Sequence, residues 1–249
     1  MLRKLAQMGY DRSSSRGMVK WAAALLAHNL LLRGGELGVV NRKAFDHTRD
    51  LTFGAFEFHE PCKDSRWLPW LTVDVVPIKD TVARRRVCPM PVQRRSGGAA
   101  GADPMCTYDA VVRAWTARAG SAPPRIGRVS GDLADAQFFL ADSGEPWGTP
   151  DTRAMAQDMG RMLGYPTTGD GSCGASSFRI GGATDWRDVF GADAERIITQ
   201  RGRWHSDIGL IYQRALAGAQ LRGSTAVGDA EGADLETLCH GWCQPATFR

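Results

Sequence analysis

Apolar side chains between Met18 and Leu32 recur at the spacing of one helix face. The positions concerned are Trp21, Leu25, Leu26 and Leu30. This period is typical of a helix packed against a core, and the glycines at positions 34 and 35 favour an end of the helix there. The segment is therefore predicted to be a core-facing helix that carries Arg33 at its end.

Three runs rich in β-branched and aromatic residues follow this helix, over Leu51–Phe58, Trp70–Val76 and Val87–Val92. Clusters of proline, aspartate and arginine separate the runs, as is typical of strands joined by exposed connections. The runs are predicted to form a small antiparallel sheet. Lys79 lies on the connection between the second and third runs.

Helical periodicity returns after residue 103 and dominates the rest of the chain. Pro104 is predicted to start a helix that runs through Trp115, since proline fits the first turn. Thr149, Pro150 and Asp151 supply a cap, a first-turn proline and a first-turn acid for a helix that reaches about residue 163. Further helices are expected over residues 176–189, 192–201 and 207–217. The predicted fold class is α+β, mainly α-helical, with a small three-stranded antiparallel sheet.

The charge of the chain permits a nucleic-acid partner without requiring one. The 249 residues carry a formal net charge of +4, with a pI near 8.8. Arg84, Arg85 and Arg86 form a dense basic run before a Gly/Ala-rich stretch at residues 97–102. Such a run is either a solvated loop or a set of phosphate contacts.

Cysteine usage and hydropathy exclude several classes of protein. Six cysteines are too sparse for a disulfide framework in 249 residues, which favours a reducing compartment. The Cys239–Cys243 segment has no second ligand pair at a suitable spacing, so no metal site is predicted. The longest apolar stretch, residues 21–32, is shorter than the roughly 20 residues of a membrane span. No secretory signal is evident, so we expect neither a membrane protein nor a secreted one.

Four side chains supply the groups needed to attack a phosphodiester without a metal: Arg33, Lys79, Arg179 and Tyr212. An arginine donates two hydrogen bonds at once to a phosphate and stays charged at any relevant pH. A tyrosine hydroxyl can form a covalent phosphodiester, and a lysine can protonate the leaving oxygen. The chain is therefore interpreted as a DNA strand-transfer enzyme.

Taken singly, these residues also have ordinary structural roles. Tyr212 lies on the apolar face of a predicted helix and would pack in a core. Arg33 would pair with Glu36, and Arg179 would pair with Asp185 or Asp188. The combined order and spacing of the residues is what favours the functional interpretation.

That order resembles the tyrosine recombinase (phage integrase) family, and the resemblance covers residues 21–217. The first family motif, an arginine three residues before a Glu-Leu pair, is present at Arg33. The second, an arginine followed by small residues, is present in part at Arg179. Lys79 matches the hairpin lysine of the family, and Tyr212 follows 33 residues after the second arginine (212 − 179 = 33).

The resemblance implies a role for each matching residue. Tyr212 would attack the scissile phosphate and hold a 3′-phosphotyrosyl link. Arg33 and Arg179 would bind the phosphate, and Lys79 would protonate the leaving 5′ oxygen. Further residues are expected to assist at the phosphate or to contact DNA: Arg203, Trp204 and His205 at the phosphate, and Arg84, Arg85, Arg86 and Ser176 on DNA.

Two positions depart from the family pattern. Ser176 stands three residues before Arg179 (179 − 3 = 176), where His or Lys is usual. Arg203 stands nine residues before the tyrosine (212 − 9 = 203), where His or Trp is usual, although a loop one residue shorter would put Trp204 there. The missing His or Lys leaves open a DNA-binding remnant without activity. A type IB topoisomerase-like enzyme shares the same chemistry and is a second alternative, although the short chain and the Arg33 motif argue against it.

The resemblance also implies an organisation and partners. Residues 1–222 would form the catalytic domain, without the N-terminal helical DNA-clamp domain that family members commonly carry. Residues 223–249 would form a linker and a docking segment. Four protomers would assemble on double-stranded DNA, with no metal, cofactor or small-molecule substrate. The working compartment would be the nucleus in a eukaryote and the cytoplasm in a bacterium.

Overall fold

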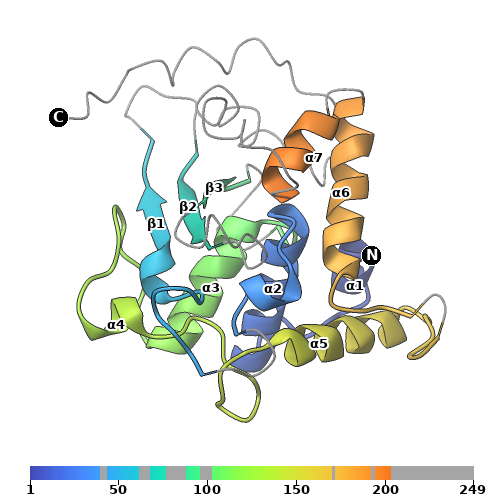
Figure 1. Cartoon of the computed structure of the whole chain (residues 1–249), viewed down its shortest axis with the longest axis horizontal. Helices are drawn as coiled ribbons and strands as arrows, with labels where there is room; N and C mark the ends of the chain where they lie inside the picture. The colour runs from blue at the N-terminus through green and yellow to red at the C-terminus, as the bar shows by residue number, and fades with distance from the viewer. Residues whose placement is uncertain are drawn as a thin grey trace.

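Helices and one small sheet make up a mixed α+β structure (Figure 1). The computed structural model describes residues 1–39, 44–61, 68–76, 88–95, 103–169, 172–191 and 194–202. Within these ranges the helices are α1 (Leu2–Gln7), α2 (Ser15–Asn29), α3 (Thr107–Ala119), α4 (Asp132–Asp135), α5 (Thr149–Met162), α6 (Ser177–Phe190) and α7 (Ala194–Gly202). The strands are β1 (Phe56–His59), β2 (Trp70–Val75) and β3 (Cys88–Gln93), and two 3-10 turns are η1 (Gly34–Glu36) and η3 (Phe53–Ala55).

The three strands form an antiparallel sheet in the order β1-β2-β3, as predicted. Val73 at the centre of β2 pairs with Phe56 on one side and with Met90 on the other. The inward face of the sheet is apolar and packs on Trp115 of α3, whose ring centroid lies 5.5 Å from that of Phe58. Alternation of apolar and polar residues along β1 and β2 therefore buries one face of the sheet.

The first strand is shorter than its apolar run suggests. The prediction of a strand over Leu51–Phe58 is wrong for its first half, because η3 occupies Phe53–Ala55 and β1 begins at Phe56. The Phe53 amide donates to the carbonyl of Ala136 at 3.0 Å instead of joining the sheet. Its ring is buried and lies 4.8 Å from the ring of Trp115, so this apolar position belongs to the core rather than to a strand.

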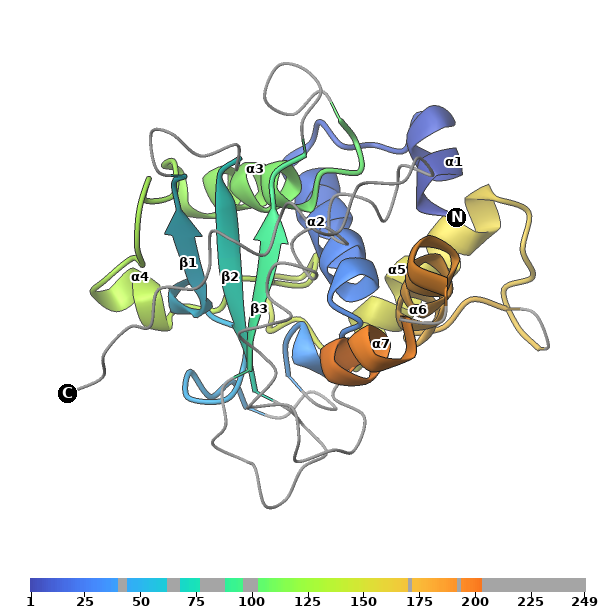
Figure 2. The same ribbon diagram turned by 90° about the horizontal axis from the view of Figure 1, so that it is seen from above.

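Helix α2 lies between the sheet and α6 in both views (Figures 1 and 2), and it is the most deeply buried helix of the described chain. It begins and ends three residues earlier than the predicted 18–32, with Ser14 as the N-cap and Leu30 as the C-cap. Leu31 then adopts a positive φ of 52°, which a non-glycine residue rarely does. Arg33 therefore lies on the chain beyond the helix rather than at its end.

Two predicted helix starts need correction. Pro104 does not open α3, which begins at Thr107 with Cys106 as its N-cap, and the Pro104 carbonyl accepts a hydrogen bond from the indole of Trp21 at 2.7 Å. The cap of α5 is Gly148 rather than Thr149, and the Gly148 amide donates to Asp151 at 2.8 Å. The short helices α1 and α4 were not predicted.

The predictions for α6 and α7 are confirmed to within two residues at each end. The predicted helix at 207–217 and the linker and docking segment at 223–249 lie outside the described residues. Among the described helices, none is long and apolar enough to cross a membrane.

One histidine of the sheet gives the fold a testable dependence on pH. His59 stacks on Trp70 with centroids 3.7 Å apart, and its Nε2 lies 3.3 Å from the Thr72 hydroxyl. Burial lowers the pKa of His59 from 6.5, with Glu57 opposing this shift and Arg128 adding to it. Below about pH 6.5 the unfolded chain therefore takes up a proton that the folded chain resists, and stability falls as the pH falls.

Urea unfolding at pH 7.5 and pH 5.5 measures this effect. The free energy of unfolding is expected to decrease on acidification by less than ~1.4 kcal/mol per pH unit, the limit for one proton. His59→Phe keeps the stack on Trp70 without titrating and should flatten the profile. An unchanged profile in His59→Phe would refute the assignment.

Candidate active site

Arg33 is held in place by Glu36, three residues further along the chain. It precedes the turn η1, and its backbone amide donates to Oε2 of Glu36 at 2.6 Å. Its guanidinium Nη1 lies 3.3 Å from Oε1 of the same carboxylate, whose side chain is fully buried, while 24% of the Arg33 side chain is exposed. The ion pair expected as the ordinary role of Arg33 is therefore present, and it leaves part of the guanidinium facing solvent.

Glu36 is expected to be important for stability as well as for the orientation of Arg33. Glu36→Gln removes the charge that accepts from the Arg33 amide, and hydrogen bonds to charged groups contribute about 1.5–3 kcal/mol. We expect the free energy of unfolding to fall by about 1.5 kcal/mol in urea titrations. Glu57→Gln is the control, because Glu57 pairs with Arg128 on the surface and should cost less than ~1 kcal/mol.

Arg179 lies in the first turn of α6 and is buried, next to the fully buried Phe178. Asp185, which the sequence offered as one possible partner of Arg179, lies 3.0 Å from Nε2 of His28 on α2. Burial acts to raise the pKa of Asp185, but the hydrogen bond and charge of His28 outweigh it, and the net shift is downward. Ser176 is exposed and directly precedes α6.

The segments that carry Arg33 and Arg179 are in direct contact, although 146 residues separate the two arginines (179 − 33 = 146). A Cβ placed on Gly34 would lie 3.1 Å from the Cβ of Ala175. Within α6, a Cβ on Gly182 would lie 2.0 Å from the carbonyl oxygen of His28. The two glycines thus allow the end of α2 and the start of α6 to approach at backbone distance.

A second apolar cluster joins the chain after α2 to α6 and α7. Its buried members are Leu31, Trp186, Ala194, Ile197 and Ile198. At its edge the Arg201 side chain is fully buried, and its Nε donates to the carbonyl of Asn29 at 2.8 Å. Sequence reasoning missed Arg201, because an arginine near the end of an amphipathic helix usually faces solvent.

Most of the predicted site residues lie outside the described residues. These are Lys79, Arg84, Arg85, Arg86, Arg203, Trp204, His205 and Tyr212. The elements on either side of them are described: β2 ends at Val75 and β3 begins at Cys88, so Lys79 belongs to the connection between paired strands. Helix α7 ends at Gly202, directly before Arg203 in the sequence.

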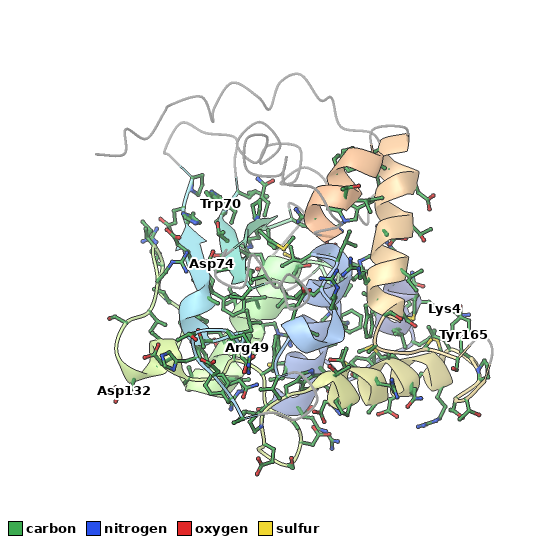
Figure 3. All side chains as sticks on the ribbon, viewed as in Figure 1. Lys4, Arg49, Trp70, Asp74, Asp132 and Tyr165 are labelled. Atoms are coloured by element: carbon green, nitrogen blue, oxygen red, sulfur yellow. The ribbon has the colours of Figure 1, made fainter. Side chains whose placement is uncertain are left out.

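A separate groove of about 340 Å³, near the end of β2, is lined by both arginine and acidic side chains. Arg49 and Asp74, both labelled in Figure 3, are among the residues that line it. Its arginines already have acidic partners: Arg49 lies 2.9 Å from Asp50, and Arg128 lies 2.5 Å from Asp74. These ion pairs occupy hydrogen-bond donors of both guanidinium groups in the groove.

Within the ranges that the structure describes, no group of three or more His, Cys, Asp or Glu side chains could hold a metal ion. Comparison with protein-family models, with curated proteins and with solved structures returned no match for this chain. The chemistry of the site therefore has to be argued from its own residues.

Proposed function

We propose that this chain cuts and rejoins DNA strands through a 3′-phosphotyrosyl intermediate, as a tyrosine recombinase does. The observation that carries the proposal is the contact between the Arg33 and Arg179 segments, through Gly34 and Ala175. Two guanidinium groups from remote parts of one chain are the means by which a metal-free site neutralises a phosphate in its transition state. A shared phosphate site needs both segments to lie close together.

In the proposed reaction the Tyr212 hydroxyl gives up its proton to water and its oxygen attacks the scissile phosphate, and the displaced 5′ oxygen takes a proton from Lys79. Arg33 and Arg179 bind the nonbridging oxygens, where negative charge accumulates. Arg203, Trp204 and His205 assist at the same phosphate. The antiparallel pairing of β2 with β3 supports the role of Lys79, because a hairpin connection can reach into a DNA groove.

The proposed partner is double-stranded DNA, with four protomers assembled on two duplexes and Arg84, Arg85 and Arg86 as phosphate contacts. Ser176 favours one second candidate, a remnant that binds DNA without cutting it. A serine in the place of the usual His or Lys removes a proton shuttle, and Ser176 is exposed at the start of α6.

The decisive experiment is a search for a covalent adduct. The protein is incubated with a pool of random-sequence duplexes nicked at one position, so that the short strand released by cleavage diffuses away and rejoining fails. We expect a DNA-linked species that survives denaturation, with the linked nucleotide mapped by mass spectrometry to the peptide that contains Tyr212. Retention of DNA without any adduct would establish the binding-only remnant, and relaxation of supercoiled plasmid without a specific site would favour the topoisomerase-like enzyme.

A further inference from the structure

The buried Arg201 side chain ties together the elements that carry the proposed site. We infer that Arg201 is a positioning residue for DNA cleavage, which acts by fixing α2, β3, α6 and α7 relative to one another. This inference rests on the function proposed above. It assigns no contact between Arg201 and DNA, because the side chain is fully buried.

Three contacts define the role of Arg201. Its Nε donates to the carbonyl oxygen of Asn29 at 2.8 Å, and its Nη2 donates to the carbonyl oxygen of Pro91 at 3.0 Å. Its guanidinium carbon lies 4.7 Å from the centre of the Trp186 ring. One side chain on α7 therefore contacts the last residue of α2, the middle of β3 and the inner face of α6.

Each contacted element leads to a group of the proposed site. Asn29 precedes Arg33 by four residues (33 − 29 = 4), and Trp186 follows Arg179 by seven (186 − 179 = 7). Strand β3 forms one side of the hairpin that carries the predicted acid Lys79. Arg201 itself is two residues before Arg203.

The chemistry of a guanidinium explains why arginine suits this position. Its nitrogens are held in a rigid plane, so that two donors aimed at two carbonyls fix the distance between those carbonyls. The guanidinium lies over the ring of Trp186, and this cation–π contact stabilises its charge. Cation–π contacts are stronger away from water. A lysine in this place has a single ammonium and cannot impose the same spacing.

Arg118 on α3 provides a matched control. It also links backbone carbonyls, with Nε 3.1 Å from the oxygen of Phe138 and Nη2 3.2 Å from the oxygen of Gln137. These contacts join α3 to the segment after α4, away from the elements that carry the proposed site. Arg118→Lys therefore makes the same chemical change as Arg201→Lys without touching the proposed tie.

The first test compares DNA binding with adduct formation in Arg201→Lys, Arg118→Lys and the wild type. Assays run well below each melting temperature, so that all three proteins are folded. We expect Arg201→Lys to bind the nicked duplex within about threefold of the wild type and to form the adduct about 100-fold more slowly, since small displacements of catalytic groups have such effects. Arg118→Lys should match the wild type in both. Parallel loss of binding and rate, or equal rates in both variants, would overturn the inference.

Trp186→Phe is a second variant for the same comparison of DNA binding with adduct formation, and it replaces Arg201→Lys if that protein does not fold. It leaves both carbonyl partners of Arg201 in place and weakens the ring contact, because the smaller phenyl group offers a poorer face to the cation. The expected adduct rate is about tenfold below that of the wild type at unchanged DNA affinity. A wild-type rate in this variant would count against the inference.

A second measurement separates failure of this inference from failure of the proposed function. Amide hydrogen exchange in the absence of DNA should rise in Arg201→Lys at the end of α2, in β3 and in α6, as well as in α7. In Arg118→Lys the increase should be confined to α3 and the segment after α4. Exchange that rises in α7 alone would refute the role of Arg201 in fixing these elements relative to one another, even if the wild type forms the adduct. The expected exchange pattern without a wild-type adduct would refute the proposed function and leave the tie standing.

Discussion

Tyr212→Phe is expected to abolish the covalent DNA adduct completely while DNA affinity stays within about twofold of the wild type. The substitution removes one oxygen atom, which is the atom proposed to attack the phosphate. The ring remains, so the size and shape of the side chain are almost unchanged. The measurement is the denaturing-gel assay on the nicked duplex pool, run beside a binding titration at the same salt concentration.

The other tyrosines of the chain are poor substitutes for this nucleophile. Burial, followed by the charges of Asp158 and Asp11, raises the pKa of Tyr10 to about 12. Burial also raises the pKa of Tyr108, so neither phenol readily loses its proton at neutral pH. Tyr165 is 49% exposed in the segment after α5, which makes Tyr165→Phe the matched control. Equal loss of adduct in Tyr165→Phe and Tyr212→Phe, or persistence of the adduct in Tyr212→Phe, would contradict the assignment.

The second large effect is expected at Gly182, where α6 meets α2. In Gly182→Ala the new Cβ would lie 2.0 Å from the His28 carbonyl oxygen and 2.8 Å from a methyl carbon of Leu31. Backbone cannot yield as a flexible side chain does, so α6 has to move away from α2. We expect the free energy of unfolding to fall by about 2–4 kcal/mol, although alanine is the better helix former.

Gly181→Ala isolates the packing effect, since it is the adjacent glycine of the same helix. Its Cβ would come no closer than 3.8 Å to the His28 ring, which is ordinary contact. Helix propensity then dominates, and the free energy of unfolding should rise by up to about 1 kcal/mol. Urea titrations of both variants measure the difference. A decrease in the free energy of unfolding in Gly182→Ala together with an increase in Gly181→Ala would support the close approach of α2 and α6. Similar changes in the two variants would disprove it.

Local features of the sequence predicted much of the fold. The helix around Trp21 and the strand around Val73 followed from the period of their apolar residues, because burial on one face leaves that period in the sequence. The run after Leu51 misled the prediction for the same reason. Phe53 is apolar because it meets Trp115 and Phe138 in the core, and a single sequence does not distinguish that partner from a neighbouring strand.

The site was less accessible to sequence reasoning, because its geometry depends on contacts between remote segments. The motif order indicated that Arg33 and Arg179 belong together, but the means of contact, Gly34 against Ala175, required the fold. The ion pair of Arg33 with Glu36 is local and was foreseen as an alternative. Arg201 gave no signal, since the carbonyls of Asn29 and Pro91 that accept its hydrogen bonds are backbone groups that every residue possesses.

The left-handed backbone conformation of Leu31 affects how stably the orientation of Arg33 is maintained. A non-glycine residue at φ 52° carries a conformational penalty of about 1–2 kcal/mol. The Leu31 side chain offsets this penalty by packing on Trp186 and the apolar face of α7. The packing of Leu31 therefore keeps the backbone in a strained conformation. If that packing were loosened, φ of Leu31 would relax to a negative value, and the orientation of Arg33 would be lost before the domain as a whole unfolded.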